Sequence, residues 1–265
     1  MDRPNVLLIC VDRWPGRPNH SLAEPTILTP TLDQLAESGI VFTNAYSTTP
    51  SCIPARRELH TGTFPRTHGD RVFNETLRMP PLPTLGQTFR DAGYQAYAVG
   101  KMHVYPQRDR IGFDDIVLSE DGRHHLGMRA DDYEQFLADE GYGGQAWAHG
   151  AGNNAPFMSR PWHLPEHLHP ANWTVNQMSR VINRRDPTRP ALWLMSFGGP
   201  HPPYTPLPGY LDLYKNVEVP MPFRGEWAER DEDMPYALRT RRHKSYPDTA
   251  LREARRAAYA LCTHI

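Results

Sequence analysis

The chain has 265 residues, of which 39% are hydrophobic, and its formal net charge at pH 7 is −1. This balance gives no indication of a nucleic-acid partner, and a mean hydropathy of −0.63 without any long apolar run excludes a membrane-spanning helix. The three cysteines, at positions 10, 52 and 262, fit neither a disulfide framework nor a zinc motif.

The first predicted element is the unbroken apolar run Asn5–Val11, which is typical of a strand buried on both faces of a sheet. The run is too short for a signal peptide and has neither a basic leader nor a small-residue cleavage site, so we expect a cytoplasmic protein. Asp12 follows directly. A carboxylate at a strand end suits a hard cation, which makes Asp12 a candidate metal ligand. The alternative is a carboxylate that only caps the strand.

Two short elements are predicted next. A helix begins at Thr29-Pro30 and stops at Gly39, because proline is favoured at the start of a helix and glycine beyond its end. The segment Ile40–Tyr46 then has the composition of a strand.

The segment Cys52-Ile-Pro-Ala-Arg56 begins a short helix that runs to His60, before Gly62. Cys52 would lie at the helix N-terminus, where free N–H groups and the helix dipole favour an anion. Arg56, one turn later, would add a fixed positive charge. A nucleophile that attacks a sulfate or phosphate ester needs such surroundings, so Cys52 and Arg56 are candidate catalytic residues. The alternative is that Cys52 is a small residue of the core.

Hydrophobic periodicity predicts further elements in the rest of the chain. The strands are Tyr94–Val99 and Ala191–Phe197, and the helices are Pro83–Ala92, Asp131–Glu140, Ala171–Arg184 and Asp248–Ile265, the last with Asp248 as its N-cap. Prolines are concentrated after residue 155, so residues 155–250 are predicted to be rich in loops. Histidines 124, 125, 163, 167 and 169 are interpreted as solvated loop residues.

Strands that alternate with helices indicate an α/β fold with a largely parallel sheet flanked by helices. Ligands bind beyond the carboxyl ends of the strands in such sheets. Lys101 and His103 follow one predicted strand and His201 follows another, so we expect them beside Asp12 and Cys52. On an extended chain, the side chains of Lys101 and His103 would point to the same side, and the prolines around His201 would hold it in an extended loop.

These residues carry a resemblance to the type I, formylglycine-dependent sulfatases, a branch of the alkaline-phosphatase-like superfamily. Four segments match that family's pattern: Pro4–Ile9 with Asp12, the C-x-P-x-R motif at Cys52, Gly100-Lys101-Met102-His103, and Ser196–Tyr204 with its His201. The resemblance implies a largely parallel mixed sheet flanked by helices.

The resemblance also implies a mechanism and its cofactors. A formylglycine-generating enzyme would oxidise Cys52 to formylglycine, and Ca²⁺ would be bound by Asp12 and the product of Cys52. Lys101 would bridge the hydrated aldehyde and the sulfate, His103 would act as the base, and His201 would assist departure of the alcohol. The substrate would be a small-molecule or carbohydrate sulfate ester.

The sequence departs from the family pattern in two places. Arg13 occupies a position where many members have a second acid, and no Asp-His or Asp-Asn pair follows His201 to complete the metal site. We therefore interpret residues 1–265 as an N-terminal portion of a sulfatase catalytic domain, apparently truncated. Its unfinished sheet should leave open edges that favour self-association, and hydrolysis by this chain alone should be weak.

Two other functions fit the same residues. A hydrolase of phosphonate or phosphate esters could use the same site, and Arg13 leaves that alternative open. An inactive fragment or anion-binding module would retain the pocket without the metal ligands.

Overall fold

The computed structural model describes residues 3–15, 26–148, 150, 159–222, 225–226 and 246–265. In this part of the chain four strands form one sheet in the order β1-β4-β2-β3, and every neighbouring pair is parallel. The strands are β1 (Val6–Val11), β2 (Gln95–Gly100), β3 (Asp115–Leu118) and β4 (Ala191–Phe197). The predicted α/β fold with a parallel sheet is therefore confirmed.

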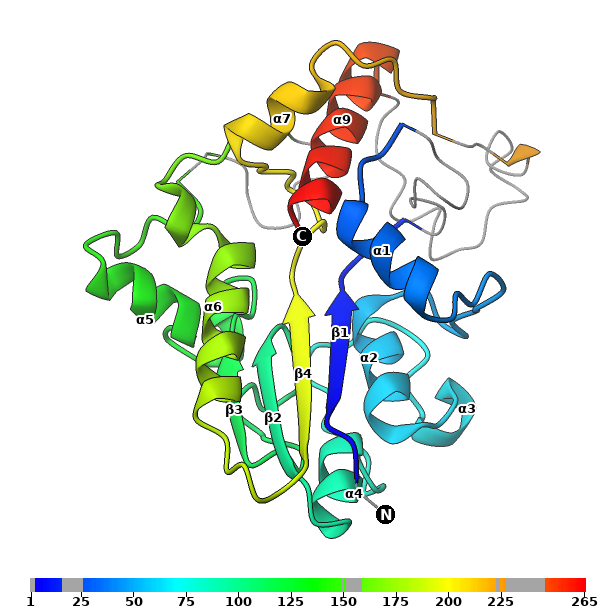
Figure 1. Cartoon of the computed structure of the whole chain (residues 1–265), viewed down its shortest axis with the longest axis vertical. Helices are drawn as coiled ribbons and strands as arrows, with labels where there is room; N and C mark the ends of the chain where they lie inside the picture. The colour runs from blue at the N-terminus through cyan, green and yellow to red at the C-terminus, as the bar shows by residue number, and fades with distance from the viewer. Residues whose placement is uncertain (1–2, 16–25, 149, 151–158, 223–224, 227–245) are drawn as a thin grey trace.

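Helices occupy most of the connections between and after the strands (Figure 1). The α-helices are α1 (Pro30–Ser38), α2 (Cys52–Thr61), α3 (Pro65–His68), α4 (Leu85–Asp91), α5 (Asp132–Asp139), α6 (Pro170–Asn183), α7 (Pro208–Tyr214) and α9 (Asp248–His264). Short 3₁₀ turns lie at His124–Leu126 and Glu166–Leu168. None of the described helices is both long and apolar enough to cross a membrane.

Helices pack on both faces of the sheet, so the sheet is the middle of three layers. Successive side chains of a strand point to opposite faces, and both faces can therefore form a core. On one face Ala96 and Ala98 of β2 pack in a cluster with Leu85 and Phe89 of α4. On the other face the cluster around Val99 contains apolar side chains of α6. The central strand β4 is buried on both faces and pairs with β1 on one side and with β2 on the other.

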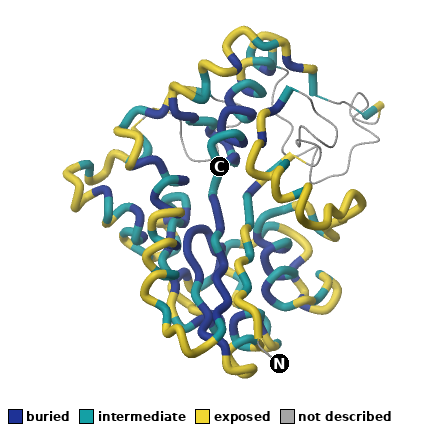
Figure 2. Tube along the Cα trace, viewed as in Figure 1, coloured by how far each residue is buried: buried dark blue, intermediate teal, exposed yellow. Residues whose placement is uncertain are grey.

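The expectation that the first strand is buried on both faces is wrong. Among the described strands β1 pairs only with β4, so it lies at the edge of the sheet. Its side chains alternate in burial, and Leu7 and Ile9 are each 47% exposed. Figure 2 shows the contrast between the exposed edge and the buried central strands. The predicted open edge is thus present at β1.

Two sequence-based assignments of strands need correction. Residues 40–46, predicted as a strand, form no strand, and Ile40, Phe42 and Tyr46 are more than three-quarters exposed. A β-like composition forms a strand only where a partner strand offers hydrogen bonds. Conversely, β3 escaped prediction because it is only four residues long.

The C-terminal helix α9 packs against α7 and buries more of its surface than its charged sequence suggested. Its buried residues include Leu251, Ala254 and Tyr259, and Tyr259 contacts Tyr214 edge-to-face. Asp248 is the first helical residue rather than the N-cap, a position that Pro247 holds in an extended conformation. Arg239, Arg241 and Arg242, which precede this helix in the sequence, lie outside the described residues.

His169 also differs from its interpretation as a solvated residue, because it is only 4% exposed. As the N-cap of α6 it accepts a hydrogen bond from Ala171 N–H at Nδ1, while Nε2 lies 3.2 Å from Thr205 O. The pKa of His169 is lowered to about 3, mainly by burial. Burial also lowers the pKa of His60 to about 3 and the pKa of His264 to about 4. These imidazoles are neutral in the folded protein.

We expect acid to destabilise the fold through these histidines. The unfolded chain binds their protons near pH 6.5 and the folded chain does not, so the stability present above that pH is lost as pH falls towards the folded pKa values. Between pH 7.5 and 5.0 His169 should lower the free energy of unfolding by about 2 kcal/mol. Urea denaturation at the two pH values measures this loss. His169→Gln, whose amide can accept and donate in place of the imidazole, should remove that share; an unchanged loss would contradict the prediction.

Candidate active site

The strand ends deliver polar residues to one edge of the sheet. The N–H of Asp12, just after β1, donates to Phe197 O over 3.2 Å, and the N–H of Lys101, just after β2, donates to Ser196 O over 2.9 Å. These bonds continue the β1–β4 and β2–β4 ladders, and they fix where the two side chains leave the sheet. His201 follows the end of β4. The carboxyl ends of three strands thus converge, as the rule for parallel sheets predicts.

Cys52 joins these residues as the first residue of α2. Ser51 is the N-cap of this helix, and its C=O accepts a hydrogen bond from Ala55 N–H over 3.0 Å. A carboxylate oxygen of Asp12, the Sγ of Cys52 and a ring nitrogen of His201 all lie within 4.8 Å of one another. The first turn of α2, with its free N–H groups, therefore lies next to these three side chains.

Lys101 is the central positive charge of the site. Although it is only 1% exposed, its Nζ lies 2.5 Å from Asp12 Oδ2 and 2.5 Å from Asp121 Oδ2. Burial by itself would lower the pKa of Lys101, but Asp121 and Asp12 outweigh it and raise that pKa. Burial would raise the pKa of Asp12, and Lys101 and Arg56 lower it instead. Lys101 and Asp12 are therefore both charged at neutral pH.

Arg56 is buried one turn into α2, where its guanidinium reaches the ends of two strands. Nη1 donates to Lys101 O over 2.5 Å and to Ser196 Oγ over 2.9 Å, while Nη2 lies 3.9 Å from Asp12 Oδ2. The charge of Arg56 is thus held in place by main-chain and side-chain acceptors.

His103 is held near the same carboxylate as Lys101. Its Nε2 lies 4.0 Å from Asp121 Oδ2, and its N–H donates to Glu120 Oε1 over 2.9 Å. Burial, followed by the charge of Lys101, lowers the pKa of His103 well below its ordinary value. A neutral imidazole beside an anion site can accept a proton.

The backbone at the site is not extended where we expected it to be. His103 has φ 55°, so it does not share one side of an extended chain with Lys101; the two side chains converge on Asp121 instead. Arg13 and Asp121 also have positive φ values, of 57° and 55°. Each such conformation costs a non-glycine residue about 1 kcal/mol or more, and conformations of this kind cluster at functional sites.

His201 lies in a turn rather than in the extended loop that its flanking prolines suggested. Its N–H donates to Gly198 O over 3.3 Å, and its Nδ1 lies 2.7 Å from Pro202 O. Burial is the largest cause that lowers the pKa of His201, and the charges of Lys101 and Arg13 add to it. Without a bound anion His201 is therefore neutral.

The side chains around Cys52 do not fit Ca²⁺ as they stand. Ca²⁺ takes six to eight oxygen ligands, whereas the cluster offers one carboxylate, one thiol and one imidazole. Conversion of the thiol to an oxygen-bearing group would still leave the set short of oxygens among the described residues.

The structure adds residues to the site that the sequence did not indicate. Asp121 binds Lys101, and Glu120 fixes the backbone of Met102 and His103 through hydrogen bonds to their N–H groups. Both acids follow β3, so the rule that places functional residues after strand ends would have found them if β3 had been recognised. Ser196 lies inside β4, and nothing in its sequence context marks it.

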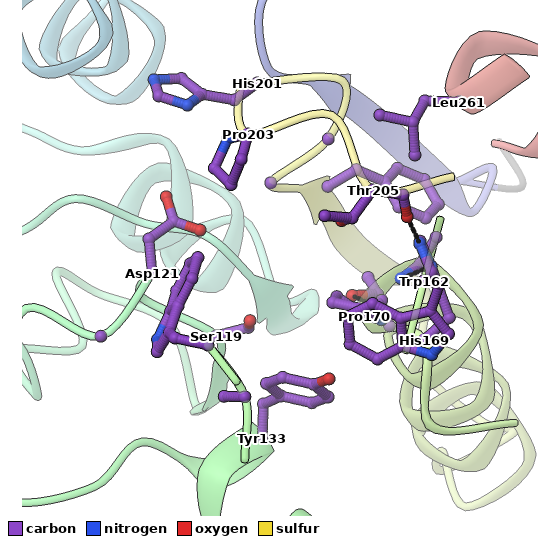
Figure 3. Close-up of a pocket in the computed structure, with 18 of the residues that line it drawn as sticks. Ser119, Asp121, Tyr133, Trp162, His169, Pro170, His201, Pro203, Thr205 and Leu261 are labelled. Atoms are coloured by element: carbon purple, nitrogen blue, oxygen red, sulfur yellow. Dashed lines mark hydrogen bonds between the residues drawn. The ribbon is translucent and has the colours of Figure 1, made fainter. Parts of the chain in front are cut away.

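A cavity of about 90 Å³ opens beside the site, between the ends of β3 and β4 and the helices α5 and α6. His201 and Asp121 line it on the side of Cys52, and Trp162 and His169 line it on the opposite side (Figure 3). Tyr133 closes its floor and donates a hydrogen bond to Leu168 O over 2.8 Å. The cavity therefore shares two residues with the cluster around Lys101.

Comparisons with known proteins show what this chain is similar to. The family model described as Sulfatase matches residues 4–248. An arylsulfatase of Clostridium perfringens is 35% identical over 276 residues, which cover 99% of this chain and 57% of the relative. A choline-sulfatase of Rhizobium meliloti is 28% identical, with 99% of this chain and 52% of the relative covered. The chain thus spans about half the length of these curated relatives.

Among solved structures, a phosphonate monoester hydrolase of Agrobacterium radiobacter superposes with a TM-score of 0.73 at 19% identity. The match covers 98% of this chain and 56% of that one. At this identity the likeness shows that the two folds agree.

Proposed function

Because this chain belongs to the sulfatase family, whose model matches residues 4–248, we propose that it hydrolyses a sulfate ester with a nucleophile derived from Cys52. The observation that carries the proposal is the position of Cys52. It begins helix α2 within 4.8 Å of both Asp12 and His201, and Lys101 and Arg56 hold two buried positive charges beside Asp12.

The nucleophile that we propose is formylglycine at Cys52. The unbroken C-x-P-x-R segment at Cys52 supports the modification, because its resemblance to the sulfatase motif includes the cysteine, the proline and the arginine. When the modification is present, its hydrated aldehyde supplies the attacking oxygen. The family resemblance implies Ca²⁺ as a cofactor, and Asp12 is the ligand that this chain would contribute; the further oxygen ligands that Ca²⁺ needs are not among the described residues of the cluster.

The side chains of the site take the following roles in this proposal. Lys101 and the N–H groups that begin α2 hold the sulfate group, since both favour an anion. His201 protonates the leaving alcohol, and a bound sulfate raises the pKa of His201 towards the range where it can do so. His103, neutral in the free site, accepts the proton of the second hydroxyl as sulfate departs. Covalent catalysis thereby divides one difficult displacement into two steps.

Co-expression with a formylglycine-generating enzyme tests the proposal. Mass spectrometry of the peptide that contains Cys52 should show conversion of CH₂SH to CHO. The purified protein should then hydrolyse an aryl sulfate, and Cys52→Ala should lower the rate at least about a thousandfold. Cys10→Ala, at a cysteine outside the cluster, is the matched control and should stay active. The rate should be low, because the described residues of the cluster offer a metal few ligands and the metal would supply little charge stabilisation.

The outcomes separate the alternative functions. A thiol that stays unmodified would refute the proposed nucleophile. Complete conversion without Cys52-dependent turnover would assign the chain to the anion-binding modules. Faster turnover of a phosphonate monoester than of the sulfate would favour the phosphonate or phosphate alternative, for which the charge of Arg13 near His201 is the relevant observation.

A further inference from the structure

Glu120 is a fully buried acid just after β3, and it does not line the cavity. Its chain neighbours Ser119 and Asp121 both line the cavity (Figure 3), whereas Glu120 is 0% exposed. A charged side chain is almost never buried so completely unless it is paired. Glu120 therefore cannot touch a bound ester, and any part it has in the site must act through the groups that it binds.

Two successive backbone N–H groups converge on one oxygen of Glu120. Its Oε1 accepts from Met102 N–H over 2.7 Å and from His103 N–H over 2.9 Å. Successive N–H groups that point to one place form a concavity that binds an anion, and here the anion is a side chain of the protein itself. The two bonds surround the strained residue His103, whose φ is 55°.

The strained turn at His103 persists only if the surrounding structure holds it. Before the turn the chain is fixed at Lys101, whose N–H donates to Ser196 O and whose C=O accepts from Arg56 and from Ser196 Oγ. The next two N–H groups have Glu120 Oε1 as their acceptor. Without this oxygen two buried donors would lose their bonds, and relaxation towards an extended backbone would move the ring of His103 away from Asp121.

Arg123 neutralises the charge of Glu120. Arg123 is 4% exposed, its Nη2 donates to Glu120 Oε2, and its Nε donates to Glu120 O over 3.4 Å. The N–H of Glu120 donates to Asp131 Oδ2 over 2.6 Å, at the capped start of α5. A buried carboxylate without a partner would be strongly destabilising. The two side chains thus have different tasks, because one oxygen of Glu120 holds the turn and the guanidinium compensates its charge.

We propose that Glu120 is a positioning residue of the active site. Its Oε1 holds the turn from which Lys101 and His103 converge on Asp121, and Arg123 serves to compensate its charge. The inference rests on the proposed function, because it takes Lys101 as the group that holds the sulfate and His103 as the base. An uncharged acceptor at position 120 should therefore replace the carboxylate once Arg123 is removed.

Two double variants of matched size separate the acceptor oxygen from the charge. Glu120→Gln with Arg123→Met keeps an oxygen for the two N–H groups, whereas Glu120→Met with Arg123→Met has a similar length without that oxygen. The shared second substitution cancels in the comparison. In formylglycine-bearing protein the glutamine double variant should hydrolyse an aryl sulfate with a kcat within about threefold of the parent, and the methionine double variant should be at least about tenfold slower than the glutamine one. Equal kcat values in the two would overturn the inference.

The single variant Glu120→Gln gives a rescue test that a merely structural role would not pass. Its amide NH₂ group would face the guanidinium of Arg123, so two donors would meet and the oxygen would turn away from the backbone. Glu120→Gln alone should therefore be slower than the glutamine double variant. A single variant as fast as the double variant would overturn the division of tasks between Glu120 and Arg123.

The ring of His103 reports its position without any turnover. Long-range proton–nitrogen spectra of the full chain, with Cys52 unmodified, show the ring nitrogens, and His103→Gln identifies the signals of His103. The methionine double variant should shift these signals, and the glutamine double variant should keep them. Unshifted signals in the methionine double variant would overturn the inference.

Glu120→Asp replaces the methionine double variant if the latter does not fold. Aspartate keeps the charge for Arg123 but is shorter by one methylene group, so its oxygens fall short of the N–H groups of Met102 and His103. Its kcat should be at least about tenfold below that of the parent. A kcat equal to that of the parent would overturn the inference.

The kinetic and spectroscopic results keep this inference apart from the proposed function. Absence of Cys52-dependent turnover in the parent, with signals of His103 that shift only in the methionine double variant, would refute the proposed function and support the positioning by Glu120. Cys52-dependent turnover that both double variants share equally would support the proposed function and refute the positioning.

Discussion

Replacing Lys101 with methionine is expected to lower the free energy of unfolding by about 3 to 5 kcal/mol. Methionine keeps most of the length of the side chain but removes the charge that lies 2.5 Å from both Asp12 and Asp121. The buried Asp12 and the partly exposed Asp121 would then lie together with Arg56, 3.9 Å from Asp12, as the nearby cation among the described residues. Removing one partner of a buried ion pair costs more than the pair contributes, because the other charge is left uncompensated.

The effect should depend on pH in a direction that identifies its cause. Without Lys101 the pKa of Asp12 rises, because the main charge that lowers it is gone, so acid relieves the repulsion by protonating this carboxylate. Chemical denaturation should therefore show a smaller difference between Lys101→Met and the parent at pH 5 than at pH 7.5. Lys215→Met, at an exposed lysine, should leave stability nearly unchanged. A parent-like midpoint for Lys101→Met at both pH values would contradict the buried-charge account.

Gly100→Ala is expected to destabilise the protein on the order of 4 kcal/mol or to prevent folding. Gly100 ends β2 with φ 102°, and a Cβ added there would lie 1.9 Å from Ser196 O. That oxygen belongs to the neighbouring strand β4 and accepts the N–H of Lys101. Neither strand can retreat without breaking the ladder that positions Lys101, so the clash has no inexpensive relief.

Thermal unfolding with a matched glycine substitution measures this effect. Gly209 in α7 has no heavy atom within 4 Å of an added Cβ, so Gly209→Ala should be neutral or slightly stabilising, as alanine is the better helix former. If Gly100→Ala unfolds at the temperature of the parent, the close approach of β2 and β4 cannot be as tight as the structure has it.

The sequence predicted the carboxyl edge of the sheet well, and physical reasons explain why. Asp12, Lys101 and His201 each follow a strong apolar strand, so one rule about parallel sheets brings them together. Cys52 needed a different signal, the proline and arginine that follow it at the start of a helix. The structure brings these residues together, while their catalytic roles stay predictions.

The remaining features depend on tertiary contacts that no local pattern encodes. The segment Ile40–Tyr46 looks like a strand and lacks a partner, whereas β3 is too short to stand out and is formed by pairing with β2. Asp121 was missed with β3. The burial of His169 follows from the elements that surround it, which lie on both sides of it in sequence.

The open edge of β1 has a consequence for the rate at which the sheet exchanges its amide hydrogens. A strand bonded on one side only can open by breaking one ladder, whereas β4 must break two. Asp12 follows one of the two edge strands, whose amides should be less protected than those of β2 and β4. A polypeptide that added a strand along the free edge of β1 would slow this exchange and hold the Asp12 carboxylate more rigidly. The order of the site therefore depends on what lies against the free edge of β1.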